Sequence, residues 1–225
     1  MMSRTNRLYW ACALSLIVAA FAATAWYYPD LPGQIPTHWN LRGEVDGRGP
    51  RSMAWLLPGL MLGLLGMFAL LPFLSPRPFD LDRTQSAYLS VMVLTIALFG
   101  YLHAVTLRAA LVPRVDVGRA MVGGLMLMLA LVGNVLGKIK RNLYLGVRTP
   151  WTLASDRVWS DTHRIAAWWF VGSGLAGLLI TVSGLPIGAA LIPLVPAIVW
   201  PIVFSYLLYR RLERDGKLPE TSTAA

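Results

Sequence analysis

The sequence has 225 residues, of which 56% are hydrophobic and only 14% are charged. Soluble domains carry about a quarter charged residues, and the mean hydropathy of +0.57 arises here from long apolar runs. This composition excludes an ordinary soluble domain and indicates an integral membrane protein. The net charge of +9 does not indicate direct nucleic-acid binding, because Lys and Arg lie between the apolar runs and form no basic aromatic module. The single cysteine, Cys12, excludes an intramolecular disulfide and a thiolate metal cluster.

Six apolar runs are long enough, or nearly so, to cross the hydrocarbon core, which takes about 17 to 25 helical residues. We expect spans at 8–27, 54–74, 88–107, 117–136, 165–185 and 187–208. The first run is too long for an ordinary signal peptide and has no small-residue cleavage pattern, so we expect it to be retained. Arg119 interrupts the start of the fourth run, which is the weakest. A turn signal from Ser183 to Pro186 makes the last two runs an antiparallel pair.

The distribution of Lys and Arg predicts the orientation, because these residues resist translocation across the membrane. With the N-terminus inside, fourteen of the twenty Lys and Arg residues lie on the cytoplasmic side. This bias favours both termini in the cytoplasm, residues 29–53 outside and residues 137–164 inside. The predicted fold is therefore an all-α integral membrane protein. It is a bundle of six transmembrane helices with a structured outer loop and a short interfacial inner helix.

Within the spans, only His103 is a clearly internal ionisable residue, and it lies toward the outer end of the third span. We interpret it as a histidine bonded to a neighbour or to water, or as part of an outer ligand site. The glycine pairs Gly59 with Gly63 and Gly133 with Gly137 have the spacing that allows helices to approach closely. The absence of an internal repeat argues against an inverted-repeat transporter.

The outer segment 35–51 is rich in glycine and proline, which indicates tight turns and an ordered loop. His38 and Asp46 could suggest a metal site, but one histidine with scattered carboxylates lacks the spacing of a known site. We therefore predict no metal and no other cofactor. Trp39, between His38 and Asn40, is typical of an anchor at the level of the lipid headgroups.

The inner segment 133–164 contains Thr149 followed by Pro150, a typical start for a helix. Trp151, Ser155 and Trp159 recur every four residues after it, which predicts one aromatic stripe on an interfacial helix that leads into the fifth span. Six cations face only two aspartates in this segment. The excess charge is either a topology signal alone or a surface that grips an anionic headgroup or an acidic partner.

Two sets of residues resemble a known family. The run from Gly137 to Asn142, the run from Gly146 to Thr152 and the run from Val158 to Arg164 strongly resemble the signature of the SdpI family of bacterial multipass membrane proteins. The outer run from Pro36 to Asn40, with Gly43, Asp46 and Gly47, resembles the uncharacterised domain that precedes this signature in the family. Arg141 stands where the family pattern has a proline. The resemblance implies a cytoplasmic-membrane protein whose best-known relative gives immunity to a secreted peptide toxin and, with toxin present, holds a transcriptional repressor at the membrane.

We therefore expect three regions: an N-terminal domain at 1–75, an SdpI-like four-span domain at 76–217 and a disordered tail at 218–225. The predicted function is immunity or signalling, with a peptide toxin or envelope ligand bound outside and a regulatory partner, such as a cytoplasmic repressor, bound inside. The alternative is a small transporter or an enzyme that modifies envelope lipids, although no catalytic constellation supports an enzyme.

Candidate residues follow from the two signatures. The outer ligand site comprises His38, Trp39, Asn40, Asp46 and His103. The inner partner site comprises Asn134, Lys138, Lys140, Arg141, Asn142, Arg148, Thr149, Pro150, Trp151, Thr152, Trp159, His163 and Arg164.

Overall fold

A computed structural model describes residues 4–40, 43–74, 84–112 and 115–218. Over these ranges, six segments are helical, long and apolar enough to cross a membrane, which confirms the six predicted spans. The long helices are α1 (Arg4–Tyr27), α2 (Leu56–Leu70), α3 (Gln85–Leu111), α4 (Val117–Leu136), α6 (Asp156–Val182) and α7 (Leu194–Arg214). Short 3-10 turns extend α2 at both ends (Arg51–Trp55 and Leu71–Leu74) and precede α7 (Ile187–Leu191). The remaining elements are a 3-10 turn after α1 (Tyr28–Asp30), α5 (Pro150–Ala154), β1 (Gln34–Trp39) and β2 (Val45–Pro50).

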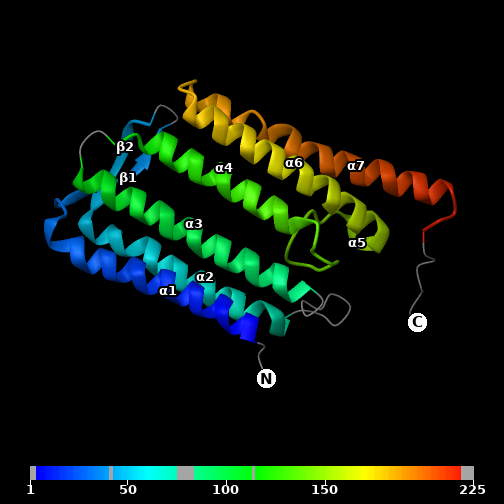
Figure 1. Cartoon of the computed structure of the whole chain (residues 1–225), viewed down its shortest axis with the longest axis horizontal. Helices are drawn as coiled ribbons and strands as arrows, with labels where there is room; N and C mark the ends of the chain where they lie inside the picture. Colours follow the sequence, from blue (N-terminus) through cyan, green and yellow to red (C-terminus); the bar gives the residue numbers. More distant parts are fainter. Residues whose placement is uncertain (1–3, 41–42, 75–83, 113–114, 219–225) are drawn as a thin grey trace.

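The helices form a staggered bundle in which α3 and α4 are central. α3 packs against α1, α2 and α4, while α6 packs between α4 and α7. α1 begins and α7 ends on the side of the bundle where α5 lies, and the two strands lie at the opposite end (Figure 1). The chain therefore presents one end built from the hairpin and one end built from the segment between α4 and α6.

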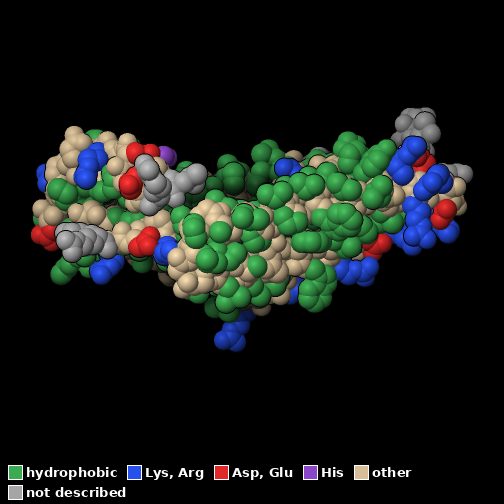
Figure 2. All heavy atoms as spheres, turned by 90° about the horizontal axis from the view of Figure 1, so that it is seen from above, with side chains coloured by type: hydrophobic (Ala, Val, Ile, Leu, Met, Phe, Trp, Pro, Cys, Tyr) green, Lys and Arg blue, Asp and Glu red, His purple; other side chains and the backbone are tan. Residues whose placement is uncertain are grey.

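The surface matches the demands of a lipid environment. Figure 2 shows apolar side chains over the middle of the molecule and charged side chains mainly toward the two ends of the view. Leu179, Ile198 and Trp168 are among the large apolar side chains that the bundle leaves exposed. Hydrocarbon can cover such side chains at no cost, whereas water cannot.

Glycines explain the close packing of α4 against α6. A Cβ added at Gly133 would lie 2.8 Å from Cβ of Phe170, and one added at Gly174 would lie 2.6 Å from the backbone nitrogen of Ala130. Neither distance is possible for real side chains, so both positions require glycine. Of the predicted pair, only Gly133 makes such an approach, because a Cβ at Gly137 would make an ordinary contact, 3.7 Å from Cβ of Ala167. The pair Gly59 and Gly63 on α2 has no such neighbour among the described residues, since a Cβ at either meets nothing within 4 Å.

The outer segment is ordered, as predicted, and forms an antiparallel β-hairpin. One expectation about local structure needs correction, because α6 begins at Asp156, nine residues before the predicted start of the fifth span. The predicted disordered tail lies, apart from Leu218, outside the described residues.

Candidate functional site

The outer candidate residues lie on the hairpin. β1 and β2 pair antiparallel, with His38 opposite Gly47 and Trp39 opposite Val45, and the register shifts on both sides of His38. The turn is closed by Asn40, whose Oδ1 accepts from the backbone nitrogen of Glu44 at 3.1 Å and whose Nδ2 donates to the Glu44 carboxylate at 2.8 Å. Asn40 is therefore bonded within the turn.

His38 and Asp46 form a pair on the hairpin surface. His38 Nδ1 lies 2.5 Å from Asp46 Oδ1, and the two side chains are 72% and 44% exposed. Gly47 allows this pairing, because a Cβ there would lie 2.9 Å from Cβ of His38. The structure thus brings together two predicted residues and presents them outward. Across the described ranges, no group of three or more His, Cys, Asp or Glu side chains could hold a metal ion.

The hairpin is fixed to the helices beneath it. Ile35 on β1 is 1% exposed and packs in one cluster with Leu31, Ala54 and Leu107 of the surrounding elements. Trp39 is half-buried and lines a hollow of about 340 Å³ between the hairpin and the ends of α3 and α4. This burial of apolar side chains holds the hairpin in a fixed position against the helices.

His103 lies apart from the hairpin pair, in the helix bundle. It is 2% exposed, and its Nε2 lies 2.8 Å from Oγ1 of Thr24 on α1. Because the Thr24 hydroxyl donates to the carbonyl of Ala20 at 2.9 Å, we assign His103 Nε2 as the donor to Thr24. The ring lines a cavity of about 600 Å³ between α1 and α3. The bonded-histidine interpretation accounts for these contacts.

The inner signature is a folded element rather than an open basic loop, and Asn142 is its hub. The Asn142 side chain is 0% exposed. Its Oδ1 accepts from the backbone nitrogens of Tyr144 and Leu145, both at 2.7 Å. Its Nδ2 donates to the carbonyls of Lys140 and Leu145 at 2.9 and 3.2 Å. One amide therefore uses both donors and both acceptor directions to close a tight turn.

The predicted start at Thr149 is confirmed, but the helix that follows is one turn long. Thr149 accepts from the backbone nitrogen of Thr152, and the Thr152 hydroxyl accepts in return from the Thr149 nitrogen at 2.8 Å, which completes a capping box. Pro150 is the first residue of α5 and is exposed. The chain turns extended at Ser155, whose side chain caps α6 through the nitrogen of Val158.

The break at Ser155 separates the two tryptophans, so the single aromatic stripe that we expected does not exist. Trp151 donates from Nε1 to the Ser205 hydroxyl and packs edge-on against Tyr206, both on α7. Trp159 donates from Nε1 to the carbonyl of Ile139 at 2.7 Å and is 2% exposed. Each ring ties the signature to a different part of the bundle.

His163 completes this inner core. Its Nδ1 donates to the carbonyl of Trp159 at 2.8 Å, and its Nε2 accepts from the backbone nitrogen of Val147 at 3.0 Å. These two bonds require the neutral ring with its proton on Nδ1. The ring stacks on Trp159 with centroids 4.1 Å apart. Gly146 has φ +104°, and a Cβ there would fall on the His163 ring, so this turn requires glycine.

The cations of the signature divide into two groups. Arg141 donates to the carbonyl of Leu153 at 2.6 Å and contacts Asp156 at 2.8 Å. Arg148 donates to the carbonyl of Leu143, and Arg164 pairs with Asp161 at 2.9 Å. Lys138 and Lys140 are exposed at the end of α4, as is Asn134 on α4 itself.

Sequence reasoning gave Arg119 no functional role. Its side chain lies at the mouth of an apolar groove between α3, α4 and α6. The sequence did offer a signal for it, because Arg119 is a cation that interrupts a membrane span. Placing a charge in the membrane costs free energy, so such residues often have a function.

Two family models and a curated relative match this chain. The model of the SdpI/YfhL protein family matches residues 138–206, and the model described as a domain of unknown function, DUF1648, matches residues 15–62. The chain is 25% identical over 206 residues to the Immunity protein SdpI of Bacillus subtilis (strain 168). The match covers 89% of this chain and 95% of that relative. No solved structure matches the chain.

Proposed function

Because this chain carries an SdpI-family segment behind a DUF1648 domain, we propose that it is a membrane immunity protein that protects a cell against a secreted peptide toxin. The similarity to the Immunity protein SdpI carries the proposal. It extends over 89% of this chain and 95% of the relative, so it includes both the hairpin and the inner signature. A likeness between apolar helices alone would not include these two polar elements.

The hairpin is the proposed toxin-binding surface. It offers the exposed pair His38 and Asp46 beside the half-buried ring of Trp39, on a platform packed against the helices. A polar pair next to an aromatic ring suits an extended peptide, because the ring supplies contact area and the pair supplies hydrogen bonds. The binding surface needs no covalent chemistry.

The inner signature is the proposed surface for a regulatory partner, such as a repressor with an acidic face. Asn142, Thr152, Trp159 and His163 are buried and hold the fold of the loop. Lys138 and Lys140 are exposed at its edge. The buried residues therefore shape the loop, and the exposed lysines make contact with the partner through charge.

A complementation assay tests the immunity function. Bacillus subtilis (strain 168) lacking its Immunity protein SdpI is grown with toxin-producing sister cells, with and without this chain. We expect the chain to restore growth and His38→Ala or Trp39→Ala to lose that protection. Gln34→Ala, an exposed position on the same strand, is the matched control and should protect fully. Full protection by all three variants would remove the hairpin from the proposal, and no protection by the correctly inserted parent chain would contradict immunity.

A second assay tests the inner surface. A fluorescent polyglutamate peptide is titrated onto inverted vesicles that contain the protein. Replacing Lys138 and Lys140 by Gln should weaken binding by about tenfold, since each cation near a membrane surface contributes about 1 kcal/mol at most. The salt dependence of peptide binding should also fall. Binding that keeps its original strength and salt dependence would leave these lysines as topology signals alone.

A further inference from the structure

A second candidate site lies within the helix bundle, away from both signatures. A groove of about 800 Å³ runs between α3, α4 and the C-terminal end of α6. Apolar side chains make up almost all of its lining, among them Leu94, Leu98, Leu127 and Leu178. Along α4 the groove extends from Arg119 to Leu131, which corresponds to about 18 Å at 1.5 Å per helical residue.

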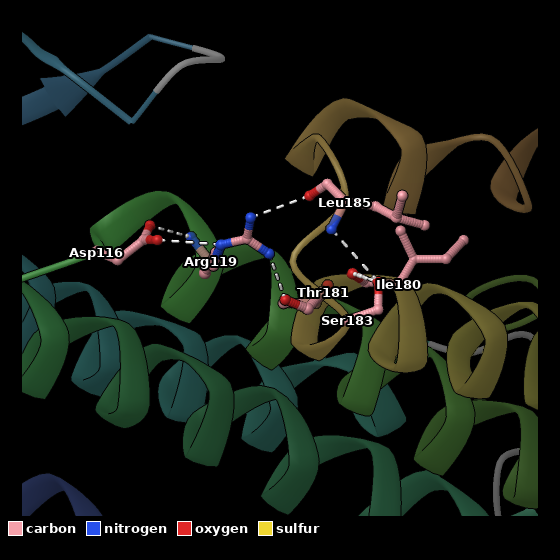
Figure 3. Close-up of polar contacts among 6 residues, drawn as sticks. All are labelled: Asp116, Arg119, Ile180, Thr181, Ser183 and Leu185. Carbon is pink, nitrogen blue, oxygen red and sulfur yellow. Dashed lines mark hydrogen bonds and ion pairs between the residues drawn. The ribbon is translucent and has the colours of Figure 1, made fainter.

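One end of this groove carries a fixed cation. The Arg119 guanidinium donates to the carbonyl of Thr181 at 2.6 Å and to the carbonyl of Leu185 at 3.0 Å, and its Nε lies 3.1 Å from the Asp116 carboxylate (Figure 3). These contacts clamp the side chain between the N-terminus of α4 and the C-terminal turn of α6. They use three of the five N–H donors of a guanidinium, and the side chain is still 33% exposed. Two donors, one on Nη1 and one on Nη2, have no acceptor among the residues that the structure describes.

The dimensions of the groove select among possible occupants. Half of a hydrocarbon core of about 30 Å is about 15 Å, so an 18 Å groove fits one leaflet. A helix of 10–12 Å diameter over that length would need roughly 1,400–2,000 Å³, well above the space present. If a methylene takes about 30 Å³, close to the share of a water molecule, the groove holds roughly 27 methylenes, which suits one or two acyl chains.

We propose that the groove binds the acyl chains of a membrane phospholipid with an anionic headgroup, whose phosphate contacts Arg119. The chains lie along α4 between α3 and α6, and the phosphate accepts from the two remaining guanidinium donors. Asp116 occupies the Nε edge, so the phosphate approaches from the side of Nη1 and Nη2. This site does not depend on the immunity proposal, because it shares no residue with the hairpin pair or the inner signature.

Photocrosslinking in nanodiscs tests the site in the full-length protein. Phosphatidylglycerol or phosphatidylcholine carries a photoactivatable acyl chain, and labelled peptides are identified by mass spectrometry. We expect phosphatidylglycerol to label residues 94–101 and 120–131 in preference to the other lipid-facing helix surfaces. Leu127→Trp should fill the groove and reduce this labelling by about tenfold, while Leu125→Trp should not. The two leucines are a matched pair on α4, 46% and 45% exposed, and only Leu127 lines the groove.

The headgroup is tested separately. Arg119→Gln should abolish the preference for phosphatidylglycerol over phosphatidylcholine, and Arg119→Lys should retain most of it, because the charge remains. Equal labelling all round the apolar belt, or labelling that Leu127→Trp leaves unchanged, would overturn the proposal. Crosslinks from the groove to a second copy of the chain would also overturn it, in favour of a protein occupant. If Arg119→Gln fails to insert, the Leu127 and Leu125 pair still decides the outcome.

Discussion

Replacing Asn142 by Ala should open the inner signature locally. The change leaves the backbone nitrogens of Tyr144 and Leu145 without their acceptor, and the carbonyls of Lys140 and Leu145 without a donor. A buried donor left unsatisfied costs about 1–3 kcal/mol, so two of them cost about 2–6 kcal/mol. Water can enter at the end of the bundle and recover part of this cost. We therefore expect the free energy of opening this loop to fall by about 2–4 kcal/mol. This change lowers the protection of its amides from hydrogen exchange by about 30- to 700-fold.

Hydrogen exchange of the protein in nanodiscs, read on the amides of Tyr144 and Leu145, measures this loss. Asn142→Asp should be no better, because its second carboxylate oxygen would face two carbonyls instead of donating to them. Asn134→Ala is the matched control, since Asn134 is exposed on α4. Unchanged protection of both amides in Asn142→Ala would refute the role of Asn142 as the hub of the loop.

Three further experiments probe the two ends of the bundle. Thr149→Ala should lower the stability of α5 by about 0.5–2 kcal/mol and speed hydrogen exchange in residues 150–154 only, because Ser155 caps α6 independently. Faster exchange throughout α6 would contradict this. Gly146→Ala should expose the signature to trypsin in inverted vesicles, since the new Cβ overlaps the His163 ring at a positive φ, and resistance equal to that of the parent protein would argue against that contact. In a protein without Cys12, Thr37→Cys should react with an impermeant maleimide on intact cells and Ser160→Cys should not, and the reverse pattern would invert the predicted orientation.

The helices could be predicted from the sequence because the length of an apolar run is set by the thickness of the bilayer, whatever the tertiary contacts. The hairpin could not. β2 contains Gly47, Gly49 and Pro50, which are poor strand residues, and it is a strand only because β1 supplies its partners. The break at Ser155 was also concealed, since the four-residue spacing of Trp151, Ser155 and Trp159 fits one helix as well as two.

The residues of the candidate site could be predicted from the sequence, but the sequence did not show which of them are buried and hold the loop and which are exposed. The signature identified Asn142, His163 and Trp159 as important, yet single-letter patterns do not show which polar groups face inward. The networks depend on contacts between residues twenty positions apart, such as Trp159 with Ile139. The groove was missed for a related reason, because Arg119 meets Thr181 and Leu185 only after α4 and α6 have packed.

The short length of α5 affects the order in which the segments of the chain fold. A helix of five residues is not stable alone, because the cost of nucleation is not recovered within one turn. Its tryptophan finds both partners, Ser205 and Tyr206, on α7, which is synthesised after α5. The inner signature therefore reaches its final shape only after the sixth span has entered the membrane. The surface of this segment is complete only then, and a chain that stops short of α7, or inserts only in part, would present a different one.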